Sequence, residues 1–378
     1  MFRWIFKYSA FIFIFNTFLL SIESTYFLGN QLFLFLSVLF AISLVLHPAQ
    51  IKLILFHKSF LFLLLIHIVS IIYFFLFHNI SDIEALKYLF ARVIQFSIIS
   101  FSIYHHYDYY KNNFLIHLSY FLFFLVLVGF IINPFIFSGR YSGVMWNPNA
   151  FSVFLIIGFG AFFLRDRYKS SLQYFMMFTF LLLALSTGSR GVIVAIILMY
   201  LLKYRLSVTT ILYACFFTSL YFLVINLDFD TSLNRFAEQE LFNDRILQYK
   251  YAFLSIKNKL ISGYGLDKYA YLDRSLVPLH LKSQIIGAHN GYLAILTQYG
   301  IIFGSIIIYI IARKAYSLMI YFYNSSNNLK VYLFIIIYTL VATLYESLIV
   351  GINEFNTILF WFSMAILSFT QFRMVNED

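Results

Sequence analysis

The sequence predicts an all-α, polytopic integral membrane protein with about 12 transmembrane helices and an extracytoplasmic helical cap. Of its 378 residues, 62% are hydrophobic and only 11% are charged, whereas a soluble domain has about 25% charged residues. The apolar residues gather in runs close to the roughly 20 residues that a helix needs to cross a bilayer. One long polar segment, 228–290, interrupts these runs. We therefore expect a single transmembrane domain, 1–378, in which 228–290 forms the cap.

Each apolar run is bounded by polar residues and is expected to form one membrane-spanning helix. Two of the runs, 149–164 and 190–204, are short. In chain order, the expected spans are 8–24, 28–46, 59–78, 85–104, 114–136, 149–164, 171–187, 190–204, 207–227, 291–312, 330–350 and 353–372.

Lysines and arginines in the short connections give the orientation, because cytoplasmic loops carry an excess of them. Of the 26 such residues, 14 fall at one set of helix ends, and only Lys87, Arg92, Arg140 and Arg190 fall at the opposite set. The others lie in 228–290, and loops of that length do not follow the rule. Both termini are therefore expected in the cytoplasm, with the cap outside.

Composition also limits the chemistry. The only cysteine, Cys215, lies in an apolar run and offers neither a disulfide nor a thiolate metal site. We expect no metal and no cofactor. In a membrane protein, the net charge of +10 indicates orientation and attraction to anionic membrane lipids before it indicates nucleic acid, which is not an expected partner.

Within the cap, residues 244–260 have the pattern of an amphipathic helix that lies on the membrane surface. Asp244 is expected to cap its N-terminus, and Ser262 with Gly263 is expected to end it. Its apolar stripe is expected to consist of Ile246, Tyr249, Phe253, Ile256 and Leu260.

Two outward arginines lie in glycine-containing turns. Arg140 belongs to the stretch 138–149, in which Asn147-Pro148-Asn149 should begin the next helix. Arg190 belongs to the tight turn 186–191, which places a guanidinium and backbone N–H groups at a helix N-terminus. Ionisable groups at a membrane edge are costly, so both are candidates for function. The second turn has the outline of an anion site.

The cap adds a third arginine and a histidine. Arg245 lies in the first turn of the cap helix, where the helix dipole also favours phosphate oxygens. His289 lies in the stretch 287–292 that opens the tenth span, and an imidazole with a pKa of about 6.5 can accept a proton from a hydroxyl. Three outward cations and one histidine suit a diphosphate leaving group and a hydroxyl nucleophile. The candidate catalytic residues are His289, Arg190 and Arg245, and the candidate substrate-binding residues are Arg140, Arg190, Arg245, Asn290 and Tyr292.

Structural roles compete with these interpretations. Any one of the arginines could instead reach out to lipid phosphates, and His289 could hydrogen-bond a backbone carbonyl at a helix start. Gly300 and Gly304 have the spacing of close helix packing and are predicted to be structural. The His105–His106 pair is predicted to lie in a solvated loop.

Four further charges have open roles. Lys87 and Arg92 either line the same cavity or flank a tilted helix. Glu346 and Glu354 bracket the short outer turn after the eleventh span and are candidate sugar or base partners.

The motifs together resemble the O-antigen polymerase and O-antigen ligase superfamily. The resemblance covers roughly residues 135 to 312 and rests on their order: Asn147-Pro148-Asn149, the turn 186–191, Arg245 ahead of Gly263-Tyr264-Gly265, and His289-Asn290 followed by Gly300. It implies a metal-independent membrane glycosyltransferase of the bacterial inner membrane, with a periplasmic active site. It also implies that Arg190 and Arg245 hold the diphosphate, while His289 activates or positions the acceptor hydroxyl.

The expected donor is an undecaprenyl-diphosphate-linked glycan, and the expected activity is that of an O-antigen polymerase, which joins lipid-linked repeat units. The high Phe, Tyr and Ile content resembles polymerases. The first alternative is an O-antigen ligase, whose acceptor is lipid A-core in lipopolysaccharide biosynthesis, and the second is a polysaccharide flippase or other transporter. A chain-length regulator is a further candidate partner.

Overall fold

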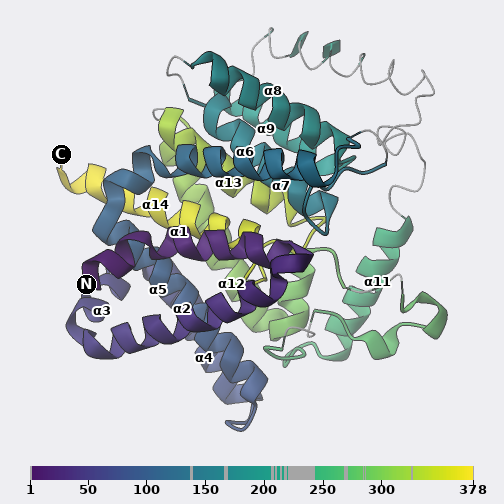
Figure 1. Ribbon diagram of the computed structural model, residues 1–378. Coiled ribbons are helices and arrows are strands. Elements are labelled where there is room, and N and C mark those ends of the chain that lie inside the picture. The colour runs from purple at the N-terminus through teal and green to yellow at the C-terminus, as the bar shows by residue number, and fades with distance from the viewer. Residues whose placement is uncertain are drawn as a thin grey trace.

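The computed structural model describes residues 2–136, 139–165, 169–205, 208, 211–212, 215–216, 219, 243–267, 271–283, 285, 287–324 and 327–377. Every regular element in these ranges is a helix. Figure 1 shows the helices crossing one another in a broad bundle, with α11 (Asn243–Asn258) set apart on one side. The all-α prediction is therefore confirmed for the described part of the chain.

The other helices follow one another along the chain with short connections. They are α1 (Phe2–Ser21), η1 (Glu23–Thr25), α2 (Tyr26–Leu46), α3 (Pro48–Leu55), α4 (Leu61–Phe77), α5 (Ile83–Asn112), α6 (Phe114–Ile132), α7 (Pro148–Phe163), α8 (Ser171–Ser186), α9 (Arg190–Tyr204), η3 (Arg274–Leu276), η4 (Leu279–Leu281), α12 (Gly291–Phe322), α13 (Asn327–Ala342) and α14 (Phe355–Glu377).

Each predicted span other than 207–227 coincides with one of these helices, and 207–227 lies mostly outside the described residues. Within the described part, five helical stretches are long and apolar enough to cross a membrane: Glu23–Ser43, Ile83–Asn112, Phe114–Ile132, Gly291–Phe322 and Phe355–Asn376. Several others are apolar but shorter. The structure supports a multi-helix membrane architecture, while the count of 12 stays a prediction.

The centre of the bundle is formed by helices that are apolar on every side. α14 is buried from Thr357 to Thr370, and α7 is buried from Phe151 to Phe163. A helix that is hydrophobic all round must lie inside other helices. α14 packs against α5 and α13, and α7 packs against α6, α8 and α9. This explains why the predicted span 149–164 is short: α7 is enclosed by protein on all its faces.

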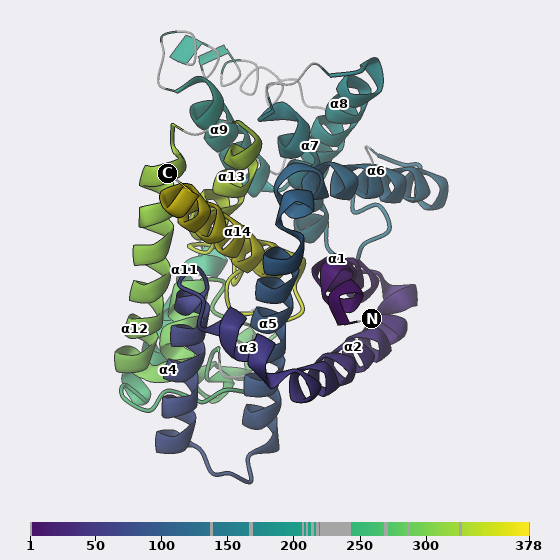
Figure 2. The same ribbon diagram turned by 90° about the vertical axis from the view of Figure 1, so that its left-hand side faces the viewer.

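α5 joins this centre to the N-terminal helices. Figure 2 shows α1 and α2 on one side of α5, with α4 and α12 on the other. In Figure 1, α1 begins and α14 ends on the left, and α11 lies on the right. Both ends of the described chain therefore lie on the side opposite to α11, as an even number of crossings requires.

Three local predictions are wrong. His105 and His106 do not lie in a solvated loop; they are in the last turns of α5, where His106 stacks on Tyr109 with ring centroids 5.1 Å apart. α11 already begins at Asn243, so Asp244 lies inside the helix and does not cap it. Local sequence gave the correct turn type in neither place, because packing against neighbouring rings and helices extends a helix beyond its polar signals.

The predicted stripe of α11 is also only partly correct. Ile246, Phe253 and Leu260 are exposed, as a membrane-surface face requires, but Ile256 is buried. The face that packs on α12 instead contains Ala252 and Ser255, which have no exposed surface. Small residues on this face allow the two helices to approach closely.

Gly300 is structural, but not through the helix packing that its spacing with Gly304 predicted. Its φ of 70° interrupts α12, and a Cβ built at this position would lie 2.1 Å from the Ile261 carbonyl oxygen. The chain between α11 and η3 docks into this break: Ile301 N–H donates to Leu260 O, and Gly265 N–H donates to Gln298 O. Only glycine fits a left-handed position this close to another backbone.

Candidate functional site

The site begins with one carboxylate shared by two of the predicted residues. Arg245 Nη2 lies 3.3 Å from Glu346 Oε1, and His289 Nδ1 lies 3.4 Å from Glu346 Oε2. The three residues come from α11, from the residues just before α12, and from the connection between α13 and α14. Their side chains are 33%, 43% and 24% exposed in the order Arg245, His289 and Glu346, so the cluster is open to solvent.

Backbone contacts place His289 against the α13–α14 connection. Asn290 caps α12 by accepting a hydrogen bond from Leu293 N–H at 3.0 Å. Gly291 N–H donates to Thr343 O at 2.9 Å and to Glu346 O at 3.2 Å. His289 itself has a φ of 41°, an uncommon conformation for a residue with a side chain. The helix start and the residue carrying the carboxylate are therefore held together by main-chain bonds.

Aromatic side chains support the arginine. The Arg245 guanidinium lies 5.4 Å from the centre of the Tyr345 ring, within the range of a cation–π contact. One turn along α11, Tyr249 Oη donates to Leu344 O at 2.7 Å. Both contacts are with the connection that carries Glu346, so the N-terminal half of α11 is tied to it.

Arg190 lies at the first position of α9, after a turn that the sequence describes well. Thr187 is fully buried and caps α8, and Gly188 takes the left-handed conformation, with φ of 61°. Ser189 is the N-cap of α9, and the first turn of the helix contains no acidic residue. A Cβ built on Gly191 would lie 3.1 Å from the Tyr338 hydroxyl and 3.2 Å from the Tyr345 hydroxyl. The N-terminus of α9 is thus next to Tyr345, the ring under Arg245.

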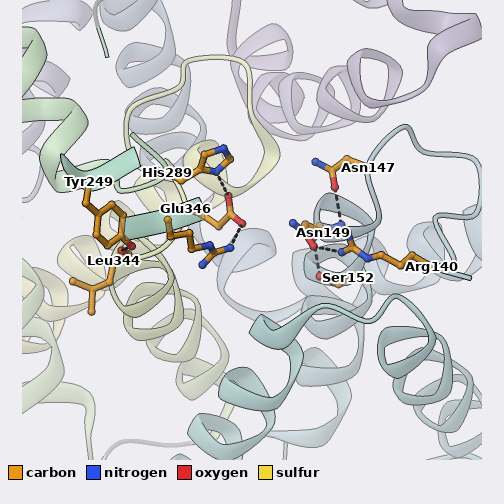
Figure 3. A network of polar contacts seen from close by, with 9 residues as sticks. Arg140, Asn147, Asn149, Ser152, Tyr249, His289, Leu344 and Glu346 are labelled. Atoms are coloured by element: carbon orange, nitrogen blue, oxygen red, sulfur yellow. Dashed lines mark hydrogen bonds and ion pairs between the residues drawn. The ribbon is translucent and has the colours of Figure 1, made fainter. Parts of the chain in front are cut away.

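Arg140 belongs to a second polar cluster. Its Nε donates to Thr187 O at 3.0 Å, and its Nη2 donates to Asn149 Oδ1. Asn147 caps α7, as the Asn-Pro-Asn motif predicted. Figure 3 shows this cluster on one side and the cluster of His289, Glu346 and Tyr249 on the other. Arg140 therefore joins the turn before α9 to the start of α7.

The side chains of Asn290 and Tyr292 are engaged by the backbone. Asn290 Nδ2 donates to Leu344 O at 3.0 Å, and Tyr292 Oη donates to Leu340 O at 2.9 Å. These bonds attach the start of α12 to the end of α13. Substrate binding by either residue stays a prediction.

The cap below the site has its own polar framework. Tyr264 Oη donates to Asp273 Oδ2 at 2.8 Å, and Ser275 N–H donates to Asp273 Oδ1 at 2.9 Å. Burial would raise the pKa of the Asp273 carboxyl, but the hydrogen bonds from Ser275 and Tyr264 lower it overall. Asp273 therefore fixes the turn that leads from α11 to η3.

The sequence comparison bears on the same region. A family model described as O-antigen ligase matches residues 175–309, from α8 into α12. This part of the chain belongs to the O-antigen polymerase and ligase superfamily. The match contains Arg190, Arg245 and His289, and it confirms the predicted resemblance. The comparison with curated proteins gave no match.

The superfamily indicates a membrane glycosyltransferase-like enzyme that acts on lipid-linked glycans. Together with the apolar helices, it indicates a multi-pass membrane protein. It does not separate polymerase from ligase. Among the described residues, no group of three or more His, Cys, Asp or Glu side chains is placed to hold a metal ion.

Sequence reasoning missed the central position of Glu346. It marked the residue only as a candidate sugar or base partner, and the match to the superfamily ends before it. The available signal was a carboxylate in a short turn on the face that carries the arginines. Glu354, the other acid of this turn, is exposed and lies 3.4 Å from the Thr357 hydroxyl.

The open roles of Lys87 and Arg92 separate clearly. Lys87 is exposed and pairs with Glu84 at 2.7 Å on the same helix. Arg92 is only 5% exposed and donates to Tyr88 Oη and Val350 O, both at 2.7 Å. Lys87 is therefore a surface residue, and Arg92 is part of the protein interior.

Proposed function

We propose that this protein is an O-antigen polymerase of the bacterial inner membrane, which joins undecaprenyl-diphosphate-linked repeat units at the periplasmic face. The observation that carries the proposal is the shared Glu346 carboxylate between Arg245 and His289. A cation that binds an anionic leaving group and an imidazole that accepts a proton are the two groups that glycosyl transfer from a lipid diphosphate requires.

In the proposed donor site, Arg245 and Arg190 hold the diphosphate. Arg190 stands at a helix N-terminus, where backbone N–H groups and the helix dipole add to its positive charge. Arg245 is partly exposed and held by one carboxylate at 3.3 Å, so phosphate oxygens can compete for it. Charge stabilisation of this kind contributes about 3 to 4 kcal/mol per well-placed donor in other enzymes. Arg140 is a third, weaker phosphate candidate.

In the proposed acceptor site, His289 takes the proton of the attacking sugar hydroxyl. That oxygen bonds to the anomeric carbon of the donor, and the bond from this carbon to the diphosphate oxygen breaks, with inversion of configuration. Glu346 faces Nδ1 of the imidazole, which leaves Nε2 on the far side of the ring for the hydroxyl (Figure 3). A carboxylate in this position orients the ring and stabilises the imidazolium that forms.

The cap supports the same reaction. α11 lies over the connection that carries Glu346, and it brings Arg245 to the site from outside the bundle. A helix over the phosphates excludes water, which limits hydrolysis of the donor. Its exposed Ile246 and Phe253 are suited to the membrane surface or to the lipid tail.

The decisive experiment is to replace His289, Arg190 or Arg245 by alanine and to separate the glycans of the cells on a gel. We expect polymer chains to be lost while the protein remains at its normal level in the membrane. Normal chains from a variant would remove that residue from the mechanism. Treatment with a chelator should leave activity unchanged, and loss of activity with EDTA would oppose a metal-independent mechanism.

Two other functions are separated by the deletion phenotype. Without a polymerase, core carries a single repeat unit; without a ligase, core is bare and lipid-linked polymer accumulates. A flippase is opposed by the position of the charged cluster at the side of the bundle that carries α11, since transporters place such groups near the midplane. Accumulation of lipid-linked repeat units on the cytoplasmic side in a deletion strain would favour the flippase.

A further inference from the structure

Arg92 holds a non-helical segment from inside the bundle. It lies nine residues into α5, or about 14 Å along the helix, and it is buried. Its Nη2 donates to Val350 O at 2.7 Å, and its Nη1 donates to Gly351 O at 3.3 Å. Three residues further along α5, Gln95 Nε2 donates to Ile352 O at 2.9 Å. Two side chains of one helix thus bind three successive carbonyls.

These carbonyls belong to residues 343–354, the connection between α13 and α14. Outside a helix, backbone carbonyls need donors, and at depth in a membrane protein no bulk water supplies them. The side chains of Ile349 and Val350 are each only 2% exposed, so this half of the connection is packed inside the bundle. Arg92 and Gln95 replace water here.

The choice of arginine at this position is physically specific. All four groups that accept hydrogen bonds from Arg92 are neutral: the two carbonyls, Tyr88 Oη and Gln95 Oε1. A buried cation without a carboxylate partner costs more than a neutral donor would. The planar guanidinium has donors on both nitrogens, so one side chain reaches two successive carbonyls and two polar neighbours, which a lysine cannot do.

The other half of the same connection carries the proposed site. Glu346 contacts Arg245 and His289, and Leu344 O accepts hydrogen bonds from Tyr249 and Asn290. Only a few residues separate Glu346 from the carbonyls that α5 holds. The position of the carboxylate therefore depends on where Arg92 anchors the chain.

We propose that Arg92 is a positioning residue for glycosyl transfer: it anchors residues 343–354 to α5 so that the Glu346 carboxylate meets both Arg245 and His289. This inference rests on the proposed function. Arg92 touches no reacting atom in it; it acts through the connection that it holds.

The test compares Arg92→Lys, Arg92→Met and Gln95→Leu with Lys87→Met, a matched change at an exposed site on the same helix. Purified protein is assayed with a lipid-diphosphate-linked repeat unit, and rates are expressed per folded molecule. We expect Arg92→Lys to lower kcat at least about tenfold, because one hydrogen bond to a charged group is worth about that factor. KM for the donor should stay within about twofold, because Arg190 and Arg245 are intact. Gln95→Leu should fall between Arg92→Lys and the wild type, and Lys87→Met should equal the wild type.

A second measurement does not depend on activity. Val350→Cys in a Cys215→Ser background gives a buried thiol as the only cysteine. Its labelling by a maleimide should be slow, and adding Arg92→Lys should speed it about tenfold or more as the connection loosens.

The inference is overturned if Arg92→Lys and Arg92→Met keep their kcat per folded molecule, or if they only reduce the amount of folded protein. Unchanged labelling of Val350→Cys would overturn it equally. Failure of the proposed function is distinguishable, because it would appear as full activity in His289→Ala, whatever the Arg92 variants show.

Discussion

The two ends of α11 are attached to the bundle by different kinds of contact. At its C-terminal end, the following turn is joined to α12 through backbone: Gly263 and Gly300 meet, and Gly265 N–H donates to Gln298 O at 3.0 Å. Tyr73 and His78 of the α4 region add side-chain bonds to the carbonyl of Ser262 and to Leu266 N–H. This end cannot shift without breaking main-chain hydrogen bonds.

At its N-terminal end, α11 is held by side chains alone among the contacts that the described residues provide. Arg245 reaches Glu346 at 3.3 Å, and Tyr249 reaches Leu344 O at 2.7 Å. Partly exposed ion pairs of this kind contribute little to stability. The firm end therefore sets where the helix lies, and the looser end leaves the arginine available to an anionic substrate.

The largest effect should come from breaking the firm end. Gly300→Ala places a Cβ against the Ile261 carbonyl in a left-handed conformation, and we expect a loss of about 3 kcal/mol or more, seen as little folded protein in the membrane. Gly129→Ala is the control, since a Cβ there has only ordinary contacts at 3.4 Å. Normal amounts of Gly300→Ala would show that the backbone junction is not what fixes α11.

Breaking the looser end should remove activity and leave the fold intact. Arg245→Lys keeps the charge but loses the planar fork, and we expect glycosyl transfer to fall about 100-fold or more at an unchanged melting temperature. Lys250→Met, an exposed change on the same helix, should have no effect. A drop in melting temperature for Arg245→Lys would mean that this end also carries the fold.

An intermediate effect is expected at His78, the side chain that accepts from Leu266 N–H at 3.2 Å. His78→Ala leaves that N–H without its acceptor and should lower the free energy of unfolding by about 1 to 3 kcal/mol. Thermal unfolding in detergent measures it, with the exposed His280→Ala as the control. Equal melting temperatures for the two variants would remove His78 from the firm end.

A smaller effect is expected for Tyr249→Phe. The change removes only the hydrogen bond to Leu344 O and should cost about 1 kcal/mol, measured by the same thermal unfolding. If Tyr249→Phe destabilised the protein as much as His78→Ala, the two ends of α11 would be equally firm.

The smallest effect concerns pH. The Ala85 N–H and then His78 hold the pKa of the Asp82 carboxyl below its ordinary value of 3.8. A depressed carboxyl pKa stabilises the fold above pH 3.8, and this stabilisation is lost as the pH falls through the lower folded value. Asp82→Asn keeps a capping group but loses the charge, so it should melt slightly below the wild type at pH 7, and the gap should close near pH 3. A gap independent of pH would show that the charge of Asp82 does not support His78.

Much of the helical architecture could be predicted, because crossing a membrane demands only a run of apolar residues. The predicted span 28–46 and α2 differ by two residues at one end, and Asn147 caps α7 as its motif indicated. The tight turn 186–191 was equally legible, because Gly188 and Ser189 act through their own local conformations.

The site was predictable in its residues but not in its centre. Arg190, Arg245 and His289 stood out because charge at a membrane edge is costly wherever the rest of the chain lies. Glu346 did not, because its importance comes from partners 101 and 57 residues away in the sequence. Arg92 and Arg245 also looked alike as cations near one face, yet one is buried among carbonyls and the other faces solvent.

By itself, the sequence determined the class of protein, the helices and the outward arginines, since hydropathy and charge are local quantities. Only the tertiary structure decided that α12 breaks at Gly300, that one carboxylate joins Arg245 to His289, and that Arg92 holds the connection behind it. Each of these depends on contacts between segments far apart in the chain. Such contacts follow from how the helices pack, which no local pattern of residues encodes.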